Sequence, residues 1–217
     1  MSNTKLPDAD NYLRDELTSY FAQYKQQKLT NRIFNDFITK VDNYAVDRPF
    51  MKLQPRSSIV SKINKDKEGF FFFDALGVEY LAYIQGKCEK YGLVSEISIG
   101  RCELPSITSE NKEFENTCLN IKKISDLDEL KHHSTTYNYT TCPYPIYLFR
   151  ELEIINTELR RIQSQLAQGI IQKAVILSDH GASRLAVLYG KESTSNIELD
   201  EKGVHSGRCC KIEEDPN

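Results

Sequence analysis

The apolar run AVIL at residues 174–177 constrains the fold of this chain more than any other stretch. A long amphipathic segment precedes the run, and Asp179, His180 and Gly181 follow it closely. A short apolar run in this setting is typical of a buried strand in a parallel sheet. Binding sites in open α/β sheets form beyond the carboxyl ends of the strands, where the chain turns into loops. We therefore expect this strand to deliver two ligand-capable side chains to a site.

The stretch at residues 68–77 repeats this arrangement. Four consecutive phenylalanines run directly into Asp74, which again places an acidic side chain at a predicted strand end. Apolar residues at helical spacing follow at residues 78–91, and Gly92 is a natural C-terminal stop for that helix. Residues 94–99 predict a second strand. Together these segments predict a β-α-β unit with an aspartate at its first turn.

The same alternation continues through the second half of the chain. Residues 120–124 predict a short strand, and residues 125–133 predict a short helix. Residues 148–168 predict an amphipathic helix that returns the chain to the strand at residues 174–177. This order of strands and helices predicts an α/β fold with a mostly parallel sheet.

The N-terminal part has a different pattern. Residues 9–47 carry apolar side chains at helical spacing with a break near residues 29–31, which predicts two amphipathic helices. Their plainest role is packing against the following domain or another neighbour. Prolines and serines then mark a connection. We therefore expect a helical segment over residues 1–65 and an α/β domain over residues 66–217.

The charge and hydropathy of the chain say more about where the protein is located in the cell than about what it binds. The net charge of −3 gives no general attraction to nucleic acid or to an anionic membrane. No apolar run reaches the length of a membrane span, and the polar N-terminus does not resemble a signal peptide, so a cytoplasmic protein without a membrane partner is expected. The six cysteines show no CxxC spacing, which favours reduced thiols over a zinc ribbon or a disulfide framework.

Metal-ligating side chains recur at the expected strand ends and turns. They are Asp74, Asp128, His132, Asp179, His180 and His205. Asp128 and His132 are four residues apart on one helical face, where they can bind a cation or pair with each other. Asp126 and His133 are the adjacent alternatives. As a set, these oxygen and nitrogen donors suit Zn²⁺ or Mn²⁺, although each residue alone also fits a cap, a turn or the surface.

Thr108 lies where a loop is expected to turn into a helix. A hydroxyl residue at that position is an ordinary N-cap. The same position also suits a nucleophile, because the amide groups of a helix start stabilise a nearby anion. The sequence leaves both roles open.

The order of these features resembles the alkaline phosphatase superfamily, and specifically the PglZ family of bacterial BREX-type phage-defence systems. The order is an aspartate at a first strand end, a hydroxyl residue, an Asp-x-x-x-His pair, Ser-Asp-His-Gly and a late histidine. The PglZ-like stretches are residues 104–108, 151–155, 178–184 and 205–208. The resemblance implies a three-layer sandwich of the alkaline phosphatase type, with helices on both faces of the sheet.

The resemblance also implies a chemistry based on two divalent metal ions, zinc or manganese. It assigns Asp74, Asp179 and His180 to one ion, and Asp128, His132 and His205 to the other. Thr108 matches the nucleophile of the phosphodiesterase branch, with Ser106 as the alternative. A metal site of this kind lowers the pKa of the nucleophile and neutralises charge in the transition state. Asn111 or Arg184 would contact the phosphoryl oxygens.

From this resemblance we expect a metal-dependent hydrolase of phosphodiesters or phosphomonoesters in phage defence, with nucleotides and nucleic acids among the possible substrates. The alternative is a catalytically silent module that binds other proteins of the defence system. A third hypothesis, a nuclease-like DNA binder, requires a basic groove near Arg184 and Arg208.

Overall fold

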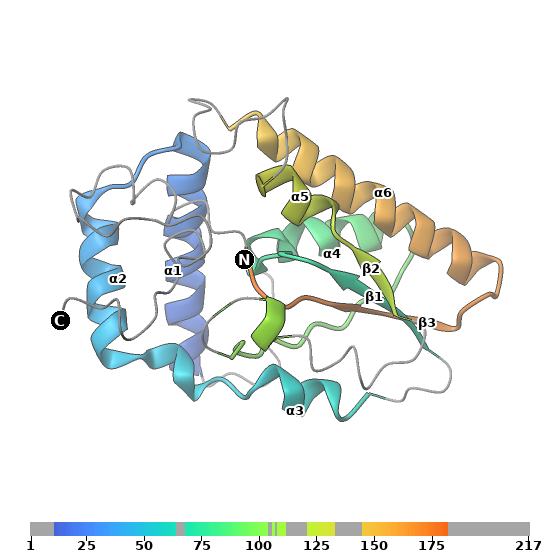
Figure 1. Ribbon diagram of the computed structural model, residues 1–217, viewed down its shortest axis with the longest axis horizontal. Coiled ribbons are helices and arrows are strands. Elements are labelled where there is room, and N and C mark those ends of the chain that lie inside the picture. Colours follow the sequence, from blue (N-terminus) through green and yellow to red (C-terminus); the bar gives the residue numbers. More distant parts are fainter. Residues whose placement is uncertain are drawn as a thin grey trace.

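A computed structural model of the chain describes residues 11–63, 68–103, 106, 108–111, 121–132 and 145–181. The elements are α1 (Asn11–Thr30), α2 (Asn35–Asp47), η1 (Pro49–Lys52), α3 (Arg56–Val60), β1 (Glu68–Phe73), η2 (Val78–Tyr80), α4 (Leu81–Lys90), η3 (Thr108–Glu110), β2 (Lys122–Ile124), α5 (Asp126–His132), α6 (Tyr147–Ala167) and β3 (Lys173–Leu177). The fold is α/β, with one parallel sheet of strand order β2-β1-β3 and the helices α1 and α2 at one end (Figure 1). The prediction of an α/β fold with a parallel sheet is thereby confirmed.

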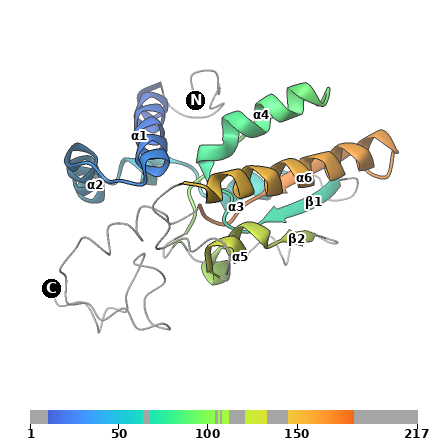
Figure 2. The same ribbon diagram turned by 90° about the horizontal axis from the view of Figure 1, so that it is seen from above.

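The central strand β1 is buried on both faces because its four phenylalanines alternate between them. Phe71 and Phe73 pack into the larger core cluster with residues of α4, α5 and α6. Phe70 and Phe72 pack on the opposite face with Val60 of α3. In Figure 1, α6 runs above the strands and α3 runs below them, and Figure 2 shows α4 and α6 alongside each other. Helices therefore cover both faces of the sheet.

The parallel register brings the carboxyl ends of all three strands to one edge of the sheet. Phe73 of β1 pairs with Ile124 of β2, and Phe72 pairs with Leu177 of β3. The residues that follow β1 and β3 in sequence, starting with Asp74, therefore emerge side by side. This is the edge at which the sequence predicts a site.

The prediction of a strand at residues 94–99 is wrong. The structure gives that segment no strand, and the second strand of the β-α-β unit is β2 instead. Ile97 and Ile99 are half-buried with the exposed Ser98 between them, so this end of the segment has the alternation of a strand. Because β2 and β3 already pair with both sides of β1, the segment has no place beside the central strand.

Two N-terminal helices are present, as predicted. Helix α1 ends at Thr30, and Asn31 adopts a left-handed conformation with φ of 53° before α2 begins. Aromatic rings join the two helices, with the ring centroids of Tyr20 and Phe37 5.5 Å apart. No helix in the described part of the chain has the length and apolar character needed to cross a membrane.

A buried polar cluster joins α1 to the α/β part of the molecule. The Nζ atom of Lys28 lies 3.3 Å from Glu79 Oε1, 3.1 Å from Glu151 Oε2 and 2.6 Å from the Tyr80 hydroxyl. The Tyr80 hydroxyl also donates to Glu151. Because Lys28 belongs to α1 and the other three residues to η2 and α6, contacts cross the boundary that the sequence predicts near residue 65.

Candidate metal centre

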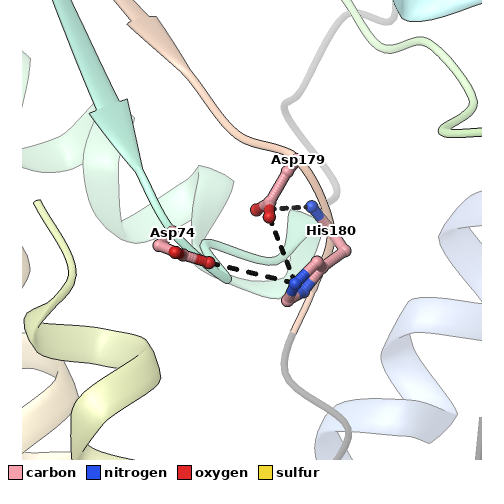
Figure 3. A group of neighbouring side chains, drawn as sticks. All are labelled: Asp74, Asp179 and His180. Carbon is pink, nitrogen blue, oxygen red and sulfur yellow. Dashed lines mark hydrogen bonds and ion pairs between the residues drawn. The ribbon is translucent and has the colours of Figure 1, made fainter. Parts of the chain in front are cut away.

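Three buried side chains converge at the carboxyl edge of the sheet. Asp74 directly follows β1, and Asp179 and His180 follow β3 (Figure 3). One potential ligand atom from each lies within 4.8 Å of the others. The exposed fraction of each residue is below one tenth, at 4%, 2% and 9% respectively. Two carboxylates and an imidazole gathered in this way form a plausible ligand set for a divalent cation.

Backbone amides hold the Asp179 carboxylate in place. Its Oδ1 atom accepts hydrogen bonds from the backbone N–H of Ala75 at 3.1 Å and from that of His180 at 2.8 Å. Ala75 points its N–H in this direction from a left-handed conformation with φ of 62°, which costs an alanine roughly 1–2 kcal/mol. Because the turns after β1 and β3 each donate a backbone N–H to Oδ1, the other oxygen, Oδ2, faces the centre of the group formed by Asp74, Asp179 and His180.

The His180 ring is oriented as a ligand. Its Nδ1 atom lies 3.1 Å from the carbonyl oxygen of Gly181, which only accepts hydrogen bonds, so Nδ1 carries the proton. The other nitrogen, Nε2, faces Asp179 Oδ2 at 3.1 Å and Asp74 Oδ1 at 3.9 Å. Acceptor atoms face one another favourably only around a proton or a metal ion. Ligands about 2.1 Å from a common ion lie roughly 3–3.5 Å apart, so the separation of 3.1 Å suits a metal, while the Asp74 oxygen at 3.9 Å would have to move closer.

Thr108 joins the three ligands from the start of η3. Its hydroxyl lies 2.7 Å from Asp179 Oδ2, 3.2 Å from His180 Nε2 and 3.4 Å from Asp74 Oδ1. The shortest contact identifies Asp179 as the main acceptor of the hydroxyl proton. The predicted nucleophile and the first predicted ligand set therefore occupy one small volume.

The pKa of Asp74 is raised above its usual value of 3.8. Burial is the largest cause, and the charges of Asp179 and Asp128 act in the same direction. Lys123 of β2 opposes them, since its Nζ atom lies 3.1 Å from Asp74 Oδ2. The ionised carboxylate is thus less stable here than in water, and a bound cation would relieve that cost.

Asp74→Asn is expected to stabilise the metal-free protein, by about 1 kcal/mol in the free energy of unfolding. The folded chain holds the Asp74 proton more tightly than the unfolded chain does, so stability is lost as the pH rises from 3.8 through the raised pKa. Asparagine removes that ionisation. Urea denaturation with a chelator at neutral pH measures the effect. The control Asp42→Asn, on the exposed surface of α2, should change little, and a less stable Asp74→Asn protein would contradict the expectation.

The structure describes only part of the second predicted ligand set. Asp128 lies on α5, and its charge contributes to the raised pKa of Asp74. His205 lies outside the described residues, as does the side chain of His132. The same holds for Arg184, the predicted phosphoryl contact. Ser106, the alternative nucleophile, is half-buried two residues before Thr108.

Asn111, the other predicted phosphoryl contact, directly follows η3. It is fully buried, and its side-chain amide bonds the backbone of Glu103 twice, accepting from the N–H at 2.7 Å and donating to the carbonyl at 3.1 Å. Its backbone N–H bonds the Thr108 carbonyl. In this arrangement the side chain organises the loop that carries Thr108, and its contact with a phosphoryl group stays a prediction.

Two cationic residues of this region have no counterpart among the sequence predictions. The reasoning that places Asp74 at a strand end could also have found Lys123, because β2 ends beside β1 and carries lysines at its edge. Arg56 contacts the turns of the site through backbone carbonyls. No sequence pattern indicates contacts of that kind.

Comparison of the chain with protein-family models, with curated proteins and with solved structures found no match. The geometry of the site therefore carries the functional argument.

Proposed function

We propose that this protein is a metal-dependent phosphoester hydrolase with Thr108 as its nucleophile. The observation that carries the proposal is the convergence of the Thr108 hydroxyl with Asp74, Asp179 and His180. A hydroxyl placed directly against a ligand set for a divalent cation suits metal-assisted phosphoryl transfer to that hydroxyl. The resemblance to the PglZ family and to an alkaline phosphatase type of sandwich belongs to the same proposal, and so does a role in phage defence.

The residues of the chain have distinct parts in this reaction. Asp179 accepts the Thr108 hydrogen bond at 2.7 Å, which draws the proton from the oxygen and makes it a better nucleophile. The Gly181 carbonyl holds the His180 ring so that Nε2 faces Asp179 and Thr108, where it could coordinate an ion. Lys123 adds positive charge beside Asp74, where it favours an anionic substrate.

A divalent ion held by Asp74, Asp179 and His180 would lower the pKa of the Thr108 hydroxyl and neutralise charge on the phosphoryl group. The ligand set fits Zn²⁺ or Mn²⁺, because both accept mixed carboxylate and imidazole donors. A second ion at Asp128, His132 and His205 remains part of the proposal.

The test is an assay on bis(4-nitrophenyl) phosphate and 4-nitrophenyl phosphate with Mn²⁺ or Zn²⁺. We expect the wild-type protein to hydrolyse at least one of them, and a chelator to abolish the reaction. The matched control is Asp179→Asn, purified identically, which loses a ligand and the acceptor of the Thr108 hydrogen bond. Its rate should fall to background.

Two results would count against the hydrolase. Equal rates in the wild type and in Asp179→Asn would point to a contaminating phosphatase. Background rates in the wild type with either metal would favour the catalytically silent module that binds other defence proteins.

A further inference from the structure

Arg56 connects the N-terminal segment to both turns of the candidate site. It is the first residue of α3, before the first strand of the sheet. Its Nη1 atom donates to the carbonyl oxygens of Ser178 at 2.9 Å and Asp179 at 2.8 Å. Its Nη2 atom donates to the carbonyl oxygen of Asn111 at 2.8 Å. One guanidinium therefore bridges the turn that carries the ligands and the turn that carries the nucleophile.

The contact with Asp179 determines where its carboxylate points. In a trans peptide the C=O and the following N–H point in opposite directions. Arg56 binds the Asp179 carbonyl, so the N–H of His180 is turned the other way, where it donates to Asp179 Oδ1 at 2.8 Å. That bond leaves Oδ2 facing Thr108 and His180 Nε2. The orientation of the ligand thus depends on a peptide plane that Arg56 holds.

The contact with Asn111 acts in the same way on the nucleophile. The backbone N–H of Asn111 closes the η3 turn on the Thr108 carbonyl at 3.0 Å, and its side chain holds Glu103. Asn111 has no exposed surface. Because Arg56 binds the carbonyl of this same residue, it ties the buried end of the Thr108 turn to the Asp179 turn.

The backbone of Arg56 is itself firmly placed. Its N–H donates to the Arg101 carbonyl, and the N–H of Arg101 donates to the Gln54 carbonyl, each at 3.0 Å. A Cβ atom on Gly100 would lie 3.0 Å from the Arg56 backbone, so the two segments pack at a distance that glycine permits. The side chain therefore extends from a fixed base into the site.

We propose that Arg56 is a positioning residue that sets the distance between the Thr108 hydroxyl and the ligands Asp179 and His180, so that the N-terminal segment completes the site. The roles of nucleophile and ligands in this statement rest on the proposed function. The positioning itself rests on the two turns and the three carbonyl oxygens that the guanidinium joins. Arginine spreads its donors over separate nitrogens of a planar fork, so that Nη1 and Nη2 bind different turns. A lysine ammonium carries its three donors on one nitrogen and does not reproduce this geometry.

The test compares the full-length variants Arg56→Ala and Arg56→Lys with the wild type and with Arg150→Ala. Arg150 pairs with exposed Glu153 on the same helix, α6, and controls for the loss of a surface arginine. Hydrogen exchange at the amides of His180 and Asn111 reports the two turns directly, and Mn²⁺ titration reports the ligand set. Millimolar guanidinium is added to Arg56→Ala to seek rescue.

We expect both Arg56 variants to exchange the two amides at least about tenfold faster, with other amides of the core unchanged. Their Mn²⁺ affinity should fall by about 10–100-fold, as for other groups that orient metal ligands. Added guanidinium should restore part of this loss in the alanine variant alone. If the alanine variant does not fold, the lysine variant gives the same exchange and titration data.

Unchanged exchange at both amides would overturn the proposal, and so would faster exchange spread evenly over the whole core, which indicates a general loss of stability. A lysine variant that matches the wild type would also overturn it, since charge alone would then suffice. If the wild type binds no Mn²⁺, the proposed metal chemistry fails, whereas the exchange data still decide the role of Arg56.

Discussion

Thr108→Ala is expected to lower the metal-dependent hydrolysis of nitrophenyl phosphoesters by on the order of 10³-fold or more, to the level of the buffer. The substitution removes the atom that attacks phosphorus, and no ligand is lost with it. The hydroxyl lies 2.7 Å from Asp179 Oδ2 and 3.2 Å from His180 Nε2, so its removal acts at the centre of the cluster. Steady-state rates with saturating Mn²⁺ measure the effect.

Three further variants make the result specific. Thr108→Ser keeps a hydroxyl at the same position and should retain most of the activity. Thr39→Ala, which removes an exposed hydroxyl on α2, should behave as the wild type. Ser106→Ala tests the alternative nucleophile. If Thr108→Ala hydrolyses as fast as the wild type while Ser106→Ala is inactive, the nucleophile is Ser106.

Lys28→Ala is expected to destabilise the fold by about 3–5 kcal/mol, because it leaves buried carboxylates without their cation. Glu79 and Glu151 both pair with the Lys28 ammonium, and one oxygen of Glu151 already has no hydrogen-bond partner. Burial by itself would lower the pKa of Lys28. The two carboxylates raise it by more than burial lowers it, so the pKa lies above its usual value of 10.5. The stabilisation is therefore fully present at neutral pH and is lost only as the pH rises through that raised pKa.

Urea denaturation of the wild type and the variant measures this loss. Lys62→Ala, at an exposed position after α3, serves as the control and should change stability by less than about 0.5 kcal/mol. Lys28→Met combined with Glu79→Gln and Glu151→Gln should recover part of the loss, because it removes the uncompensated charges. A loss below 1 kcal/mol in Lys28→Ala would show that the cluster is not a buried ion pair in solution.

The local patterns of the sequence predict most of the described fold. Four phenylalanines on β1 indicate a strand buried on both faces, and the structure places them alternately against α3 and against the α4–α6 side. The positions of Asp74, Asp179 and His180 after their strands follow from the same reasoning, because parallel strands end at one edge. Strand ends and turns are local features, so the sequence alone can reveal them.

The remaining features depend on contacts between distant parts of the chain. The alternation at residues 94–99 is that of a strand, but the pairing of β1 with β2 and β3 decides against it. Arg56 binds carbonyls more than fifty residues away, at positions whose side chains are irrelevant to the contact. Glu151 is a further case, since it is buried on α6 and its cation, Lys28, lies on α1.

The most direct measurement of the proposed site is anomalous diffraction from crystals of the full chain grown with Zn²⁺. At this site we expect a peak about 2.0–2.2 Å from a carboxylate oxygen of Asp74, from Asp179 Oδ2 and from His180 Nε2. The same peak should be missing from crystals of Asp179→Asn. Wild-type crystals in which these three side chains are well ordered and no metal lies between them would contradict the proposed metal centre.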